Sequence, residues 1–153
     1  MELDSKFIVI ELNNERYGID LQQVKSIEKM QKITQLPQAS FVKGVINLRG
    51  IVTPIIDLKE RLKLGHSTYS DDLQLLIVQI NELQVGLIVD KAHDVIDLDE
   101  TKIEQISDIY EEIDHSLLKG IAKIDNMLLI LLNVNAVLNQ EEINEVDQLV
   151  ATE

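Results

Sequence analysis

The sequence contains no cysteine and no tryptophan, and aromatic residues make up only 3% of its 153 residues. The absence of cysteine excludes a disulfide framework, thiolate catalysis and cysteine-ligated metal sites. The scarcity of aromatic rings disfavours stacking of nucleic-acid bases on exposed side chains. No apolar run reaches membrane-spanning length, and the first residues lack the pattern of a signal peptide. Together these absences are typical of a soluble protein of the reducing cytoplasm.

Basic residues are also few, with 14 Lys and Arg against 27 Asp and Glu and a formal net charge of −13. Nucleic acids and anionic membranes bind through clustered Lys and Arg, so this charge disfavours both kinds of partner. A strongly acidic chain can instead meet a basic or apolar protein surface. We therefore expect protein partners, no nucleic acid and no direct membrane insertion.

The sequence has no recognisable catalytic or metal-binding motif. His66, His93 and His115 lie far apart and in no metal-ligand spacing. Neither a phosphate-binding glycine-rich loop nor a Gly-x-Ser-x-Gly elbow is present. Acid pairs such as Asp71-Asp72 lie in polar stretches, although a small hydrolase with facing carboxylates in a groove is an alternative. We predict no enzymatic activity, no cofactor, no metal and no small-molecule substrate.

Residues 44–58 form the most distinctive stretch, which is an apolar strand, a turn and a second apolar strand. Gly44 and Gly50 permit a turn or a close backbone approach that other residues resist. Pro54 cannot donate a ladder hydrogen bond, which indicates a strand edge or a strand entry. Arg49 lies at the bend and must reach water or find a partner. The stretch therefore predicts a β-hairpin with a functional candidate at its tip.

Two helices are predicted from capping signals. Asp57 is a candidate N-cap for a helix over 58–64, which Gly65 would end. Near the end of the chain, Asn139 and Glu142 have the spacing of a capping box, which predicts an acidic terminal helix.

The apolar pattern occurs twice along the chain. A shift of 68 positions places Gly18 on Gly86, and a shift of 76 places Gly44 on Gly120. The apolar register holds through both blocks, which indicates an internal duplication. Because the two shifts differ by eight, the second copy has a longer connection, within residues 96–119.

Each copy contains four or five short strands, and a unit of roughly 65 residues buries its edges best by closing into a small barrel. The predicted fold is mainly β, with two tandem, pseudo-repeated five-stranded barrels, short helices and a C-terminal helix. We expect the first barrel at 5–65, a linker at 66–72, the second barrel at 73–138 and the helix at 139–153. All four belong to a single domain covering residues 1–153.

The duplication also bears on Arg49, whose counterpart in the second copy is Asp125. A charge that the repeated fold does not keep is not required by that fold. The arginine is either a structural residue paired with a nearby acid or a contact to a partner protein, where arginine is enriched.

Four blocks of the sequence match a known family: Tyr17-Gly-Ile-Asp20, Phe41-Val-Lys-Gly-Val-Ile-Asn-Leu-Arg-Gly50, Pro54-Ile-Ile-Asp-Leu58 and Val85-Gly-Leu-Ile-Val-Asp90. In these blocks and over nearly its whole length, the chain resembles the CheW-type coupling proteins of bacterial chemotaxis. The resemblance implies two SH3-like barrels with an apolar seam and a non-enzymatic scaffold. Its implied partners are the regulatory domain of the histidine kinase CheA and the cytoplasmic tip of a methyl-accepting receptor. It also implies recruitment to receptor arrays at the inner face of the membrane. A coupling protein of a parallel pathway, such as twitching motility, is an alternative.

The resemblance also implies roles for individual residues. By matching position, the residues that face the receptor or the kinase are Val24, Ser26, Ile27, Arg49, Leu75, Val95 and Ile109. The matched structural motif comprises Gly44, Asn47, Gly50, Pro54 and Asp57. Many relatives have a glutamate where Ser26 stands, and that acid can pair with the arginine, so Glu28 is the candidate partner of Arg49 here. Whether Val24 belongs to the core or to an interface stays open.

Overall fold

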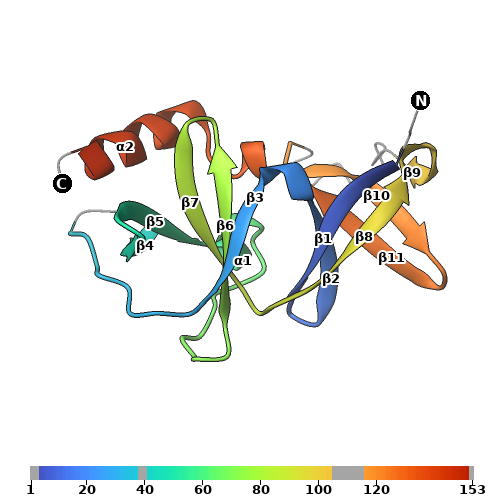
Figure 1. The fold of residues 1–153 in the computed structure, drawn as a ribbon, viewed down its shortest axis with the longest axis horizontal. Coiled ribbons are helices and arrows are strands. Elements are labelled where there is room, and N and C mark those ends of the chain that lie inside the picture. The colour runs from blue at the N-terminus through green and yellow to red at the C-terminus, as the bar shows by residue number, and fades with distance from the viewer. Residues whose placement is uncertain (1–3, 38–40, 105–115, 152–153) are drawn as a thin grey trace.

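The computed structural model describes residues 4–37, 41–104 and 116–151, which form two β-rich lobes side by side (Figure 1). The strands are β1 (Asp4–Leu12), β2 (Glu15–Asp20), β3 (Val24–Lys29), β4 (Val42–Leu48), β5 (Ile51–Asp57), β6 (Gln74–Ile80), β7 (Leu83–Val89), β8 (Lys91–Asp99), β9 (Ile103–Glu104), β10 (Leu118–Ile124) and β11 (Met127–Leu132). The helices are α1 (Leu58–Arg61), α2 (Gln140–Ala151) and the 3₁₀ turns η1 (Leu21–Gln23), η2 (Glu100–Lys102) and η4 (Val134–Ala136). In this part of the chain, no helix is long and apolar enough to cross a membrane.

The strands form two sheets, each of which curls into a small barrel. Barrel A is the six-stranded sheet in the order β8-β1-β2-β11-β10-β9, and barrel B is the five-stranded sheet in the order β3-β6-β7-β5-β4. The sixth strand of barrel A is the two-residue β9. A single bridge between Thr34 and Val45 takes the same place in barrel B. The mainly β fold with two small barrels is therefore confirmed.

The predicted boundaries of the two barrels are wrong, because the copies exchange their first hairpins. The hairpin β1–β2 belongs to the first copy but pairs with β8 and β11 of the second. In return, β6–β7 of the second copy pairs with β3 and β5 of the first. Barrel B is therefore built from residues within 24–89, and barrel A from residues on both sides of it. A repeat pattern identifies equivalent strands, but it does not say which copy each strand pairs with.

Equivalent strands pair in the same register in both barrels, which confirms the two shifts found in the sequence. In the parallel pair of barrel A, Leu131 lies opposite Gly18, and in that of barrel B, Ile55 lies opposite Gly86. A Cβ atom on either glycine would meet the side chain of the residue opposite. These two glycines are thus repeated because strand packing leaves no room for a side chain there.

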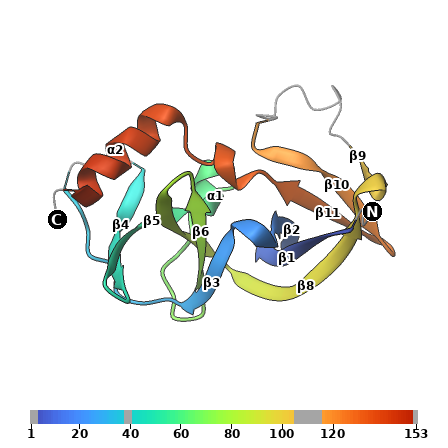
Figure 2. The same cartoon turned by 45° about the horizontal axis from the view of Figure 1, so that its top comes forward.

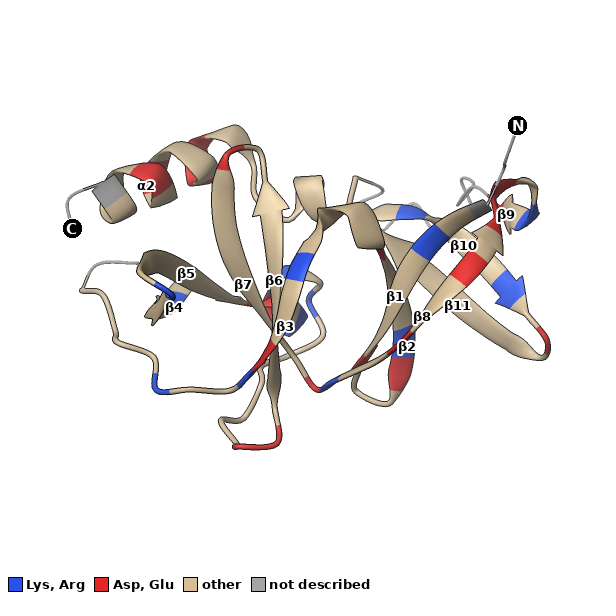
Figure 3. Cartoon of the chain, viewed as in Figure 1, with Lys and Arg blue, Asp and Glu red and all other residues tan. Residues whose placement is uncertain are grey.

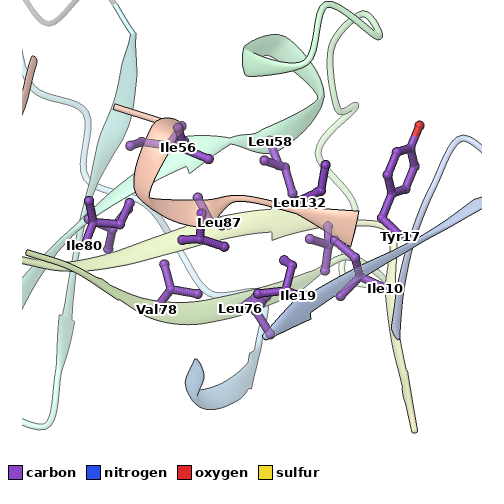
Figure 4. Close-up of a cluster of buried hydrophobic side chains, with 14 of the residues drawn as sticks. Ile10, Tyr17, Ile19, Ile56, Leu58, Leu76, Val78, Ile80, Leu87 and Leu132 are labelled. Atoms are coloured by element: carbon purple, nitrogen blue, oxygen red, sulfur yellow. The ribbon is translucent and has the colours of Figure 1, made fainter. Parts of the chain in front are cut away.

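The largest core lies between the barrels, and each barrel has a smaller core of its own. Figure 4 shows the shared core, where side chains from both barrels meet, among them Ile10, Ile19, Ile56, Leu76 and Leu87. It consists of aliphatic side chains and Tyr17. Burial in this core is the first cause that raises the pKa of the Tyr17 hydroxyl, and the charge of Glu15 adds to it. This core is the apolar seam that the resemblance implies.

Polar contacts also join the barrels where the chain passes from β7 to β8. The Asp90 carboxylate accepts a hydrogen bond from the Asn13 backbone N–H at 2.8 Å and pairs with Lys59 Nζ at 2.8 Å. The Asn13 side chain donates to the Leu64 carbonyl at 2.9 Å. Lys59 is nearly buried, so its pairing with Asp90 satisfies a charge that would otherwise be costly to bury. These contacts fix the relative position of the two barrels.

The two predicted helices differ in outcome. The Asp57 side chain caps α1 as predicted, but the helix ends at Arg61 because Lys63 and Gly65 adopt positive φ angles of 60° and 103°. The terminal helix α2 begins with the predicted capping box. Asn139 Oδ1 accepts from the Glu142 N–H at 2.8 Å, and Glu142 Oε1 accepts from the Asn139 N–H at 3.0 Å.

Helix α2 returns to barrel B after the chain has completed barrel A (Figure 1). Its Val146 is fully buried, and Ile143 packs against the shared core. Arg61 binds the helix start, donating to Glu142 Oε1 at 2.6 Å and to the Val137 carbonyl at 3.0 Å. The terminal helix therefore covers barrel B through both apolar and charged contacts.

Candidate docking surface

The candidate arginine lies at the tip of the β4–β5 hairpin. Arg49 and Gly50 have φ angles of 51° and 85°, and the Asn47 side chain accepts a hydrogen bond from the Gly50 N–H at 2.9 Å. Two successive left-handed residues are typical of the type I′ turn that suits a two-residue hairpin loop. The turn therefore depends on Asn47 and Gly50, and it directs the Arg49 side chain outward.

Arg49 contacts the predicted partner, Glu28 of β3. Its Nη2 lies 3.3 Å from Glu28 Oε2, which confirms the candidate pair. The arginine side chain is 71% exposed, whereas that of Glu28 is only 16% exposed. Because an exposed ion pair contributes little to stability, this contact orients the guanidinium more than it holds the fold.

A shallow hollow of about 170 Å³ lies beside the arginine, between β3 and the β4–β5 hairpin. Lys25 and Ser26 of β3 and Ile51 of β5 contribute to its lining. Gln84 forms its polar wall, accepting from Lys25 Nζ at 3.2 Å and donating to Thr53 Oγ1 at 2.9 Å. The predicted residues Ser26 and Arg49 are therefore brought together at one surface.

Exposed aliphatic side chains occur in this hollow, through Ile51, and on the edge strands β3 and β8 of the two barrels. Ile27 of β3 is 40% exposed, Ile51 is 48% exposed and Val95 of β8 is 45% exposed. Strands β3 and β8 are edge strands of their barrels, and both lie on the same side of the molecule (Figure 2). Ile51 was not predicted as a surface residue, because β5 is apolar on both faces and its sequence does not indicate which residues are exposed.

The remaining predicted contact residues have different positions. Val24 is half-buried and packs against the shared core, so it belongs partly to the interior. Leu75 is fully buried in the core of barrel B and cannot contact a partner directly, so its predicted role is wrong. The strand around it is apolar on both faces, which hid its direction in the sequence. Ile109 lies outside the described residues.

The structural motif residues act through the backbone and through caps. A Cβ atom on Gly44 would overlap the Thr34 carbonyl, and φ is +149°, so only glycine fits. Pro54 lies within β5, which has neighbours on both sides. However, its pair Val45 exchanges hydrogen bonds with Thr34 instead, and the β5–β7 pairing starts one residue later. Strand β5 is therefore internal, but Pro54 lies at a position where neither neighbouring strand needs a hydrogen bond from its nitrogen.

Among the described residues, Asp57 is the acidic residue with a buried side chain. Its hydrogen bonds compensate for the loss of water around the carboxylate. It accepts from the Ser67 N–H at 2.6 Å, from Ser67 Oγ at 2.7 Å and from the Lys59 N–H at 3.2 Å. This set ties the linker to the start of α1. Asp57 is thus a structural residue, as predicted.

The histidines and the acid pairs are the candidates for metal-binding or catalytic groups. Among the residues that the structure describes, no group of three or more His, Cys, Asp or Glu could hold a metal ion. His66 contacts Glu60 at 3.2 Å, and His93 is largely covered, 3.8 Å from Glu11. His115 lies outside the described residues. The seam between the barrels is aliphatic, which is the arrangement that the adaptor hypothesis predicts in place of facing carboxylates.

Comparison with known proteins identifies a consistent set of relatives. The family model of the CheW-like domain matches residues 6–142. The chain is 42% identical over 137 residues to the chemotaxis protein CheW of Bacillus subtilis, covering 89% of this chain and 88% of that protein. It is 30% identical over 143 residues to the chemotaxis protein CheW of Klebsiella aerogenes, covering 93% and 86%. The crystal structure of the scaffolding protein TtCheW from Thermoanaerobacter tengcongensis matches with a TM-score of 0.82 and 36% identity, covering 94% and 95%.

Proposed function

Because this chain belongs to the CheW-like family, we propose that it joins the cytoplasmic tip of a chemoreceptor to the regulatory domain of the histidine kinase CheA. It is a non-enzymatic adaptor of bacterial chemotaxis. It works in the cytoplasm, in receptor arrays at the inner face of the membrane. The observation that carries the proposal is exposed Arg49 with Ile51 beside it, together with exposed Ile27 and Val95 on the edge strands of the two barrels.

The chemistry of this surface suits a protein partner. Arginine is enriched at interfaces, and the burial of exposed aliphatic side chains under a partner favours binding. Ile27 and Ile51 lie on barrel B, and Val95 lies on barrel A, so a partner that covers all three must bridge both barrels. A receptor tip, which is a pair of antiparallel helices, has the elongated shape that such a bridge needs.

Arg49 can leave its intramolecular ion pair and bind a partner instead. Its ion pair with Glu28 is long and exposed on the arginine side, so the guanidinium can exchange it for a carboxylate of a partner at little cost. Such charge-assisted hydrogen bonds strengthen when a partner excludes water from them. We therefore assign Arg49 to partner contact and Glu28 to its orientation in the free protein.

The proposal is tested by calorimetric titration of the protein with the kinase regulatory domain and, separately, with a receptor-tip fragment. We expect both to bind. The variant Arg49→Ala should bind at least one of them about tenfold more weakly, equivalent to about 1.4 kcal/mol. The matched control is Arg16→Ala, which removes another exposed arginine, on β2.

Two outcomes would contradict the proposal. If neither partner binds at several hundred micromolar, the adaptor function as stated is wrong. If Arg49→Ala unfolds the protein while Arg16→Ala does not, Arg49 is a structural residue and the docking surface must lie elsewhere.

A further inference from the structure

A second and larger hollow, of about 420 Å³, opens in barrel B and shares no lining residue with the surface around Arg49. The connection after β3 forms one wall through Met30, Lys32 and Ile33. The linker before β6 forms another through Ser67 and Tyr69. A volume between 300 and 1,000 Å³ is typical of small-molecule sites, which often lie at the mouths of β-barrels.

The floor of this hollow is apolar and belongs to the core of barrel B. Leu73 and Ile88 reach it from that core and are 9% and 6% exposed. Met30 and Ile33 pack against the same cluster. The Met30 N–H donates to the Leu73 carbonyl at 3.3 Å, which closes the hollow on one side. An aliphatic or aromatic group placed here would contact side chains that are already held in position.

The rim is basic, although the chain as a whole has a net charge of −13. Lys32 is exposed and forms no ion pair with any residue that the structure describes. Lys43 also lines the hollow, and its Nζ binds Glu60 Oε1 at 2.8 Å. The Asp57 carboxylate lies deeper and is occupied by its three hydrogen bonds. In Figure 3, the described part of the connection between β3 and β4 is coloured as basic at Lys32 in the sequence and is nowhere coloured as acidic. The available charge at the rim is therefore a lysine.

We propose that this hollow binds a small amphipathic carboxylate. Its apolar body lies on the floor formed by Leu73, Ile88 and Met30, and its carboxylate pairs with Lys32 Nζ. The Tyr69 ring, 60% exposed in the free protein, covers the bound molecule from the side of the linker. A neutral ligand would leave Lys32 unused, and a cation would be repelled by it. Charge and apolar shape together select an anion with a hydrophobic body.

The test is a titration of the ¹⁵N-labelled full chain with 4-phenylbutyrate, followed by amide chemical shifts. We expect saturable shifts at the amides of 30–35, 67–69 and 88, with a dissociation constant in the low millimolar range or tighter. The neutral amide and the cationic amine of the same phenylbutyl group should bind at least tenfold more weakly. A lack of saturable shifts at these residues up to 10 mM would overturn the proposal, as would equal affinity for the neutral amide.

Two variants with the same charge change locate the carboxylate. Lys32→Glu should weaken 4-phenylbutyrate binding at least tenfold, whereas Lys91→Glu, at an exposed position of β8, should leave it within twofold. Equal weakening in both variants would assign the effect to net charge and reject the site. Because neither lysine is part of the docking surface proposed above, failure here leaves the receptor and kinase titrations unaffected, and the two proposals fail separately.

Discussion

The β4–β5 turn of barrel B and the β10–β11 turn of barrel A have residues of opposite charge at equivalent positions, both with positive φ. Arg49 and Asp125 occupy equivalent positions in the two copies, with φ angles of 51° and 53°. The left-handed conformation is required at both hairpin tips, because it matches the twist of the flanking strands. The side chain is free to differ. The duplication thus separates what the fold needs, a turn, from what only one barrel has, an exposed guanidinium.

The same comparison explains why the larger hollow belongs to barrel B. Its floor residue Ile88 corresponds to Asp20 in barrel A, and its rim residue Lys43 corresponds to Lys119. In barrel A these two residues face each other, with Lys119 Nζ 3.7 Å from the Asp20 carboxylate. In barrel B the apolar Ile88 stands in place of the acid, and Lys43 pairs with Glu60 instead. The two copies share strands and register but differ in surface chemistry.

The largest expected effect comes from separating the two copies. A fragment of residues 1–72 contains β1 to β5 but lacks β6 and β7, which lie between β3 and β5 in barrel B. We expect this fragment to show no cooperative unfolding, and an equimolar mixture with 73–153 to recover the native circular dichroism and a urea transition.

The opposite result is physically possible, because both copies pair in the same register. If the 1–72 fragment alone unfolds cooperatively, its own hairpin has closed the barrel, as in the contiguous arrangement. The exchange of hairpins would then be dispensable for folding. The fragment 73–153 is the matched control, since it is deprived of its partner strands in the same way.

The next effect is at the equivalent glycines Gly44 and Gly120. A Cβ atom at Gly44 would overlap the Thr34 carbonyl at a φ of +149°, whereas at Gly120 it would lie 2.8 Å from the Glu104 carbonyl oxygen. We expect Gly44→Ala to lower the free energy of unfolding by about 2–3 kcal/mol and Gly120→Ala by about 1–2 kcal/mol. Urea denaturation measures both. A larger loss at Gly120 would mean that the close approach in barrel B is not the tighter one.

The smallest effect concerns Glu60, whose counterpart in barrel A is Ala136. Partial burial opposes its ionisation, but hydrogen bonds and charges from Lys43 and His66 outweigh burial and lower the pKa of the carboxyl. Since the folded pKa is the lower one, this stabilisation is present above the ordinary value of 4.5 and is lost as pH falls through the lowered value. Glu60→Gln should therefore cost at most about 1 kcal/mol at pH 7.

The pH dependence provides the check on Glu60. The difference in unfolding free energy between the wild type and Glu60→Gln should shrink as the pH falls below 4.5. Glu82→Gln, at an exposed turn, is the control and should show no such trend. A difference that stays constant down to the acid range would show that the carboxylate charge is not what stabilises this corner.

The sequence predicted local features well because their causes are local. The capping box of Asn139 and Glu142 and the turn at Gly50 each depend on residues three apart or fewer. The ion pair of Arg49 with Glu28 could be predicted only from the family resemblance, because Ser26 replaces the glutamate that many relatives have. The sequence could not show which hairpin pairs with which barrel. The exchange of hairpins leaves every strand register unchanged, so the apolar pattern is the same with or without it. Leu75 was misplaced for a related reason, since a strand that is apolar on both faces does not indicate its exposed side.

The most direct test of the account is to exchange the charges of the two turns. Arg49→Asp and Asp125→Arg exchange exposed side chains at two residues of similar φ, so both variants should unfold within about 0.5 kcal/mol of the wild type. Calorimetry with the kinase regulatory domain and the receptor-tip fragment then compares affinities. We predict that Arg49→Asp loses at least tenfold in affinity for one partner, while Asp125→Arg stays within twofold for both. Equal losses in the two variants, or none in Arg49→Asp, would contradict the assignment of Arg49 to partner contact.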